Sequence, residues 1–137
     1  MERNQLEKHI SSMLDNTRFC SFATVEGGKP HVRYMTVYHD GLTIYLATNR
    51  KSHKVEELDD NPHVHILTEL KDDKPDEFLQ IEATATVTKD DSLRHKVWND
   101  WLKPWFEGPD DPDYVILEVK PSRIAFAKDM NVQVWEA

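Results

Sequence analysis

The sequence predicts a mainly β fold with flanking helices, in which antiparallel strands form a barrel or a sandwich. Apolar and polar residues alternate along many short runs, as in strands that bury one face. Gly27-Gly28 and Asp40-Gly41 interrupt these runs as tight hairpin signals. Only three stretches have helical spacing, so six to eight strands and three helices are expected. We expect residues 1–137 to form one domain, because this length suffices for one core.

Helical spacing and strand-like alternation follow one another in the first half of the chain. Its expected elements are a helix at 4–16, a strand at 18–26, a strand from Pro30 to the Asp40-Gly41 turn, a strand at 42–48 and a helix at 52–60. In the first strand, Cys20, Phe22 and Thr24 share one face.

The second half is richer in strands. Its expected elements are strands at 63–70 and 77–89, a helix from the N-cap cluster Asp90-Asp91-Ser92 through Leu102, and strands at 114–120, 123–127 and 132–135. Pro121-Ser122 is expected to separate two of the last strands. Two acidic loops, 71–76 and 107–113, either exclude anionic substrates or are simply solvated.

Composition narrows the function classes. A net charge of −8 argues against general binding of nucleic acid or anionic membranes, which requires a basic surface. Cys20 is the single cysteine, which excludes an internal disulfide and a thiolate zinc site; its apolar surroundings indicate a buried, inert thiol. No stretch has the length of a membrane span or a signal-peptide core, so a cytoplasmic protein is expected.

A cluster of hydroxyls and cations stands where a strand leads into a helix. It consists of Thr48, Ser52, His53 and Lys54, and Arg33 lies on the preceding strand. Unpaired N–H groups and the helix dipole favour an anion at such a junction, so a phosphate could bind there. From spacing alone, a solvated, basic helix start explains the same residues.

Other catalytic patterns are missing. His63 and His65 share a strand face, as do His31 and His39, but there is no H-E-x-x-H motif, and no metal site is expected. The chain has no G-x-S-x-G motif, and its four glycines cannot supply a Rossmann or Walker loop.

The tryptophans indicate packing sites. Trp98, Trp101 and Trp105 fall in or beside one helix, which indicates core or interface packing. Trp135 either packs in its own core or reaches a neighbouring subunit and covers a flat ligand there.

These motifs together resemble a known family. The order runs T-R-x-C-S-F-A-T, Gly-Gly, P-H-V-R-Y-M-T, D-G, I-Y-L-A-T-N-x-x-S-H-K and N-P-H-V. It is similar to the pyridoxamine 5′-phosphate oxidase-like flavin-binding proteins, and within them to the bacterial general stress protein branch. The resemblance implies a six-stranded antiparallel Greek-key split β-barrel and a homodimer with FMN in a cleft between the subunits.

The resemblance also implies roles for individual residues. The phosphate and ribityl chain of the flavin would be held by Arg33, Lys54, Thr48 and Ser52, with His53 beside them. The main chain of Met35, Thr36 and Val37 would line the ring, and Gln80 and Trp135 would reach the flavin from the other subunit. The basic C-terminal segment of the true oxidases is absent, so vitamin B6 oxidation is not expected.

Two functions follow from this resemblance. The first is an FMN-dependent oxidoreductase of unknown substrate, linked to the stress response. The alternative is a non-catalytic module on the same fold that stores or senses flavin or serves as a scaffold. A third reading replaces FMN with haem or a deazaflavin. In the oxidoreductase, the flavin would perform the chemistry and the protein would bind it and tune its electrostatics. No catalytic side chain is assigned.

Overall fold

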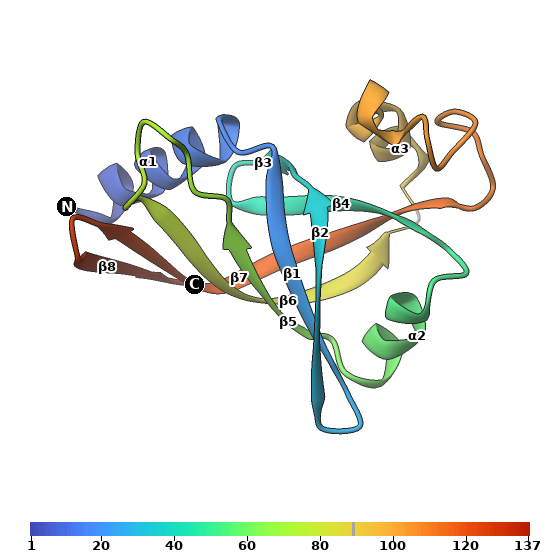
Figure 1. The fold of residues 1–137 in the computed structure, drawn as a ribbon, viewed down its shortest axis with the longest axis horizontal. Helices are drawn as coiled ribbons and strands as arrows, with labels where there is room; N and C mark the ends of the chain where they lie inside the picture. The colour runs from blue at the N-terminus through green and yellow to red at the C-terminus, as the bar shows by residue number, and fades with distance from the viewer. Residues whose placement is uncertain (89) are drawn as a thin grey trace.

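The computed structural model describes residues 1–88 and 90–137, except for the side chain of His53. It contains three α-helices, a short 3-10 helix and eight strands (Figure 1). In chain order they are α1 (Arg3–Asp15), β1 (Phe19–Glu26), β2 (Lys29–Thr36), β3 (Tyr38–Asp40), β4 (Thr43–Asn49), α2 (His53–Asp60), β5 (His63–Thr68), β6 (Phe78–Thr88), α3 (Asp91–Val97), η1 (Asp100–Leu102), β7 (Tyr114–Lys128) and β8 (Asn131–Glu136).

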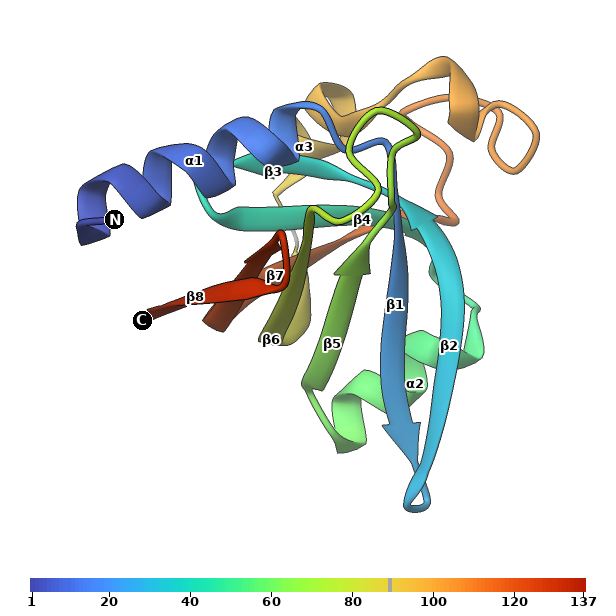
Figure 2. The ribbon, with the colours of Figure 1, turned by 60° about the vertical axis from the view of Figure 1, so that its left-hand side comes forward.

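The strands form one antiparallel sheet that curls into a half-barrel. Its order is β2-β1-β5-β6-β7-β4-β3, and β8 pairs with β7. β2 and β3 lie at opposite ends of this order, although only Val37 separates them in the chain. The sheet therefore has to curl round, as Figures 1 and 2 show. The predicted mainly β, split-barrel class is confirmed, with eight strands rather than six.

The single strand expected from Pro30 to Asp40 is divided at Val37. Its first part pairs with β1 and its second part with β4, so the chain changes neighbours there. The predicted hairpins are present: Gly27 and Gly28 have φ values of 56° and 76°, and Gly41 has a φ of 60°. These left-handed values are accessible to glycine at little cost, which explains why the turns fall at these residues.

The prediction that Pro121-Ser122 separates two strands was wrong. β7 runs without a break from Tyr114 to Lys128 along β6. The ladder shifts register between Glu82 and Ala83, because Glu82 faces Arg123 and Ala83 faces Pro121. Ser122 is the extra residue of this bulge, and its Oγ donates to the carbonyl oxygen of Glu82 over 3.1 Å. A bulge accommodates a proline that a regular ladder would exclude.

The helix that was expected to run from Asp90 through Leu102 is shorter than predicted. It starts as predicted, since the Asp90 side chain accepts a hydrogen bond from the backbone N–H of Ser92, but it ends at Val97. Asn99 is extended and accepts from the backbone N–H of Trp101 over 2.9 Å, which starts η1 as a separate turn. The strand expected at 77–89 matches β6 as far as Thr88, and Lys89 lies outside the described residues.

The core lies inside the curled sheet and beneath α1. Helix α1 contributes Leu6, Ile10 and Leu14, while Phe22 of β1 is fully buried. α1 contacts β3 and β8, and α2 contacts β1 and β6 at another side of the sheet (Figure 2). In the described part of the chain, no helix combines the length and the apolar character needed to cross a membrane.

Candidate functional site

A pocket of about 410 Å³ opens between β2, β4 and the segment around η1. Five of the residues expected to hold a flavin line it: Arg33, Met35, Thr36, Thr48 and Lys54. Period-two alternation explains part of this convergence, since Arg33 and Met35 lie on one face of β2. The curl of the sheet supplies the rest by bringing β4 and the start of α2 alongside β2.

The guanidinium of Arg33 is held from behind by buried groups. Its Nη1 donates to Oγ1 of Thr24 over 2.7 Å, and its Nη2 lies 3.5 Å from Oε2 of Glu57. Thr24 in turn donates to the same Glu57 oxygen. An arginine has five N–H donors, so donors remain for a ligand in the pocket. These contacts orient the guanidinium before any ligand arrives.

The Glu57 carboxylate balances part of the Arg33 charge. Its side chain is only 2% exposed. Burial raises the pKa of Glu57, but the hydrogen bond from Thr24 and the charge of Arg33 outweigh this effect and hold the pKa below its usual range. Glu57 is therefore ionised at neutral pH.

The second cation of the pocket is Lys54. Its Nζ donates to Oγ1 of Thr48 over 2.5 Å and lies 3.5 Å from Oγ of Ser52. The two hydroxyl oxygens are 3.4 Å apart. Burial lowers the pKa of Lys54, and the neighbouring charge of Arg33 lowers it further. An anion between these two cations would offset both effects, so this end of the pocket suits a phosphate.

The remaining wall of the pocket is apolar. Leu102, Trp105 and Phe106, named here the apolar wall, line the same pocket as the two cations, and so does Phe19. Trp105 is 71% exposed at the rim. The sequence marked Trp105 only as a packing residue, because nothing local shows that the chain turns back toward β2 after η1.

Among the described side chains, four of the expected site residues do not line this pocket, namely Val37, Ser52, Gln80 and Trp135. Val37 lines a neighbouring hollow beside Trp101, and Gln80 is exposed on β6. Trp135 packs in its own core, where its Nε1 donates to Oε1 of Glu7 over 2.9 Å. The side chain of His53 lies outside the described part of the structure.

Another hollow, of about 380 Å³, lies between α1 and the loop that follows β5. It is lined by residues such as His9, Glu69 and Lys71, and by none of the expected flavin-binding residues. The pocket at Arg33 and Lys54 is therefore the candidate site.

Comparison with known proteins shows the family of this chain. The family model described as pyridoxamine 5′-phosphate oxidase matches residues 6–128. The chain belongs to the pyridoxamine 5′-phosphate oxidase family. Within this family it is 41% identical to general stress protein 26 of Bacillus subtilis over 125 residues, which cover 90% of this chain and 89% of the relative. The predicted general stress protein branch is thereby confirmed.

Two solved structures show how far the family likeness extends. General stress protein 26 from Bacillus anthracis superposes with a TM-score of 0.88 at 30% identity, over 96% of this chain and 98% of that one. A structure titled F420 reductase superposes with a TM-score of 0.67 at 25% identity, over 83% and 94% of the two chains. This chain therefore shares the split-barrel fold with both structures over most of its length.

Proposed function

We propose that this protein is a cytoplasmic, homodimeric FMN-binding protein that acts as a flavin-dependent oxidoreductase in the stress response, with residues 1–137 as one flavin-binding domain per subunit. One observation carries the proposal: Arg33, Lys54 and Thr48 meet at one end of a pocket whose other wall is apolar. FMN has the same two parts, a doubly charged phosphate and a flat aromatic ring. The pocket volume of about 410 Å³ also falls within the usual range for small-molecule sites.

The phosphate would take the place between the two cations. Arg33 is already oriented by Thr24 and Glu57, so few degrees of freedom are lost on binding. Lys54 would share its N–H donors between Thr48, Ser52 and the phosphate. The ring would lie along the main chain at Met35, Thr36 and Val37, as the family resemblance implies.

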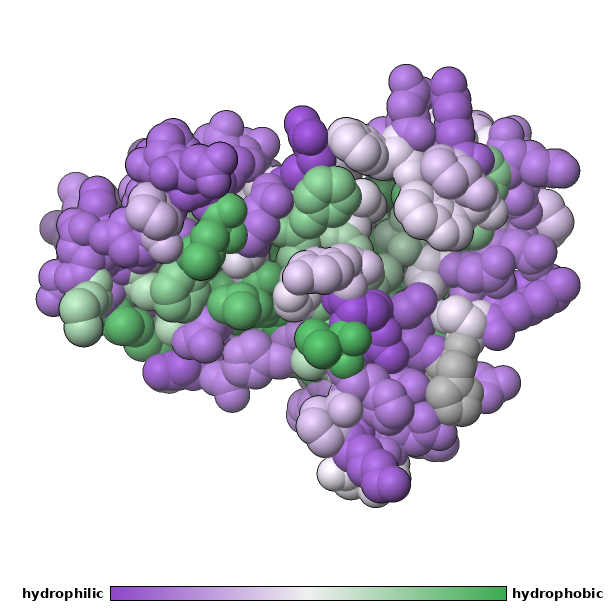
Figure 3. All heavy atoms as spheres, viewed as in Figure 1, coloured by the Kyte–Doolittle hydropathy of each residue, from purple (hydrophilic) through white to green (hydrophobic). Residues whose placement is uncertain are grey.

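Exposed apolar residues support a dimer over this site. Tyr34 is 85% exposed, and it stands in one cross-strand row with Ser21, Leu67 and Gln80. Leu67 is 42% exposed. Figure 3 shows hydrophobic residues along the middle of the molecule on the face that carries β1 and β2, with hydrophilic residues around them. A two-fold contact over this face would bring Gln80 of one subunit toward the pocket of the other.

The chain and the flavin would divide the chemistry. Flavin, when bound, supplies hydride or electron transfer, and the protein supplies binding, orientation and exclusion of water. The apolar wall would shield the ring, and a second subunit would cover the exposed rim at Tyr34 and Trp105. A side chain that acts as acid or base is not part of this proposal.

The first experiment is reconstitution with FMN followed by desalting and a visible spectrum. The wild type is expected to retain flavin bands, and the variant Arg33→Ala with Lys54→Ala is expected to lose them. Arg50→Ala with Lys51→Ala is the matched control, because it removes the same charge from exposed residues that do not line the pocket. Bands that persist in the first double variant would move the phosphate site elsewhere, and no bands in the wild type would refute FMN binding.

A non-catalytic flavin-binding module is the second candidate. It is favoured by one observation: the described residues that line the pocket include no histidine or carboxylate that could transfer protons. Oxidation of NADH or NADPH under anaerobic conditions separates the two, since only the oxidoreductase would consume the nucleotide. Because a structure titled F420 reductase has this fold, a deazaflavin should be tested as the competing ligand.

A further inference from the structure

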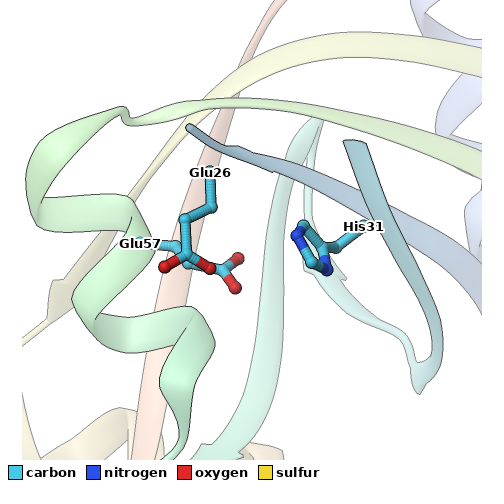
Figure 4. A group of neighbouring side chains, drawn as sticks. All are labelled: Glu26, His31 and Glu57. Carbon is cyan, nitrogen blue, oxygen red and sulfur yellow. The ribbon is translucent and has the colours of Figure 1, made fainter. Parts of the chain in front are cut away.

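Three side chains from different elements converge behind the pocket. Glu26 ends β1, His31 lies on β2 and Glu57 lies on α2. A carboxylate oxygen of each glutamate and a ring nitrogen of His31 all lie within 4.8 Å of one another. Figure 4 shows the two carboxylates and the imidazole turned toward a common space. No local sequence pattern marks this group, because its members are brought together only by the packing of α2 on the β1–β2 hairpin.

The three groups combine one rigid donor with two adjustable ones. Glu57 is 3% exposed and is positioned by Thr24 and Arg33. His31 is exposed and Glu26 is half-buried, so rotation of these two side chains can bring their donor atoms closer to Glu57. Ligands of a tetrahedral zinc ion lie about 3.3 Å apart, because each stands about 2.0 Å from the metal. The widest separation in the group would have to shorten by at most about 1.5 Å to reach that geometry.

Charge favours a cation in this space. The carboxylates of Glu26 and Glu57 bring two negative charges together, and Arg33, at 3.5 Å from Glu57, supplies one positive charge. Imidazole with carboxylate oxygens is a donor set that suits zinc and other transition metals, whereas calcium and magnesium take oxygen ligands alone.

We propose that Glu26, His31 and Glu57 bind a divalent transition-metal cation, with zinc as the best match. The metal would join the tip of the β1–β2 hairpin to α2. With three protein ligands, a fourth position stays open for water. Because Glu57 also contacts Arg33, the metal would steady the guanidinium that faces the pocket. This site does not depend on flavin binding.

The test uses the full chain, freed of metal by a chelator and kept without flavin. Co²⁺ serves as the spectroscopic probe, followed by its visible absorbance, and Zn²⁺ is then added in competition. One equivalent of Co²⁺ per chain is expected to bind in the micromolar range and to be displaced by Zn²⁺. Glu26→Gln and His31→Ala are each expected to weaken binding by at least about tenfold, since even outer-shell changes at metal sites cost that much. His31 is exposed and Glu26 is half-buried, and a thermal melt without metal checks that both variants fold.

The matched control removes the same two residue types elsewhere. His65 and Glu82 face each other across β5 and β6 and are exposed, so His65→Ala with Glu82→Gln should leave binding unchanged. Zn²⁺ is expected to raise the melting temperature of the wild type and of this control, but not of Glu26→Gln. Equal binding by Glu26→Gln, His31→Ala and wild type would overturn the proposal, and so would binding only at millimolar metal.

Discussion

The Nζ atom of Lys54 donates a hydrogen bond to Oγ1 of Thr48 over 2.5 Å, and this contact joins the first turn of α2 to the end of β4. It places a partly buried ammonium group at the same pocket as the Arg33 guanidinium. Repulsion between these two cations lowers the pKa of Lys54 in addition to the effect of burial. An anionic ligand would relieve this repulsion.

Replacement of Lys54 by methionine tests this contact. Hydrogen bonds to charged groups contribute about 1.5–3 kcal/mol, so the dissociation constant for FMN should rise by roughly tenfold to a hundredfold. Lys51→Met is the control, since Lys51 is exposed and lies outside the pocket. Fluorescence titration of FMN measures both. Equal affinity in the two variants would show that Lys54 does not contact the phosphate.

The lowered pKa of Lys54 also predicts a pH dependence. The charged ammonium favours the anion, so FMN affinity should fall as pH rises through the pKa of Lys54 in the free protein. Because that pKa lies below the value of an ordinary lysine, the fall should begin at a lower pH than for an exposed lysine. In Lys54→Arg, whose guanidinium stays charged, this part of the pH profile should be flat. Parallel profiles for the two proteins would contradict the assignment.

Thr24 supports both Arg33 and Glu57, and its replacement by valine should destabilise the fold. The substitution keeps the shape but removes the acceptor for Arg33 and the donor to Glu57. Loss of one partner from buried polar groups costs about 1–3 kcal/mol, measurable by urea denaturation. Thr86→Val makes the same chemical change at an exposed position of β6 and should be nearly neutral. A neutral Thr24→Val would show that water replaces the lost contacts.

Substitutions of Trp135 test whether this side chain packs in its own core or contacts a ligand. The ring is 9% exposed, and Arg3 lies over it at 5.1 Å. Trp135→Ala should cost about 3–5 kcal/mol through the cavity it leaves, whereas Trp135→Phe should lose mainly the hydrogen bond to Glu7, about 0.5–1.5 kcal/mol. Denaturation curves measure both. A changed flavin spectrum in Trp135→Phe would indicate that the ring also reaches a flavin, as the family resemblance implies.

Cys20 should be chemically silent in the folded protein. Burial, together with the nearby charge of Glu69, raises the pKa of its thiol to about 12. At pH 8 the thiolate fraction is then on the order of one in ten thousand, and the thiolate is the reactive form. A colorimetric disulfide reagent should therefore label the native chain slowly and the urea-unfolded chain at once. Fast labelling of the native chain would show that the thiol is accessible.

Sequence patterns alone predicted most of the fold and part of the candidate site. Period-two alternation correctly placed Cys20, Phe22 and Thr24 on one face of β1, and the structure shows that this face enters the core. The glycine turns and the Asp90 cap were predictable for a similar reason, since each depends on a few neighbouring residues. Arg33, Thr48 and Lys54 were predicted as site residues, and the structure brings them to one pocket; their role in binding stays a prediction.

Other features could be seen only in the tertiary structure, because they depend on contacts between segments that are distant in the sequence. The bulge at Ser122 let β7 continue through Pro121, and the break at Val37 turned one expected strand into both edges of the sheet. The return of the chain after η1 placed Trp105 in the same pocket as the cations, and packing of α2 on β1 brought Glu57 to Glu26 and His31. Local propensity acts over a few residues, whereas these arrangements depend on how the whole sheet curls around its core.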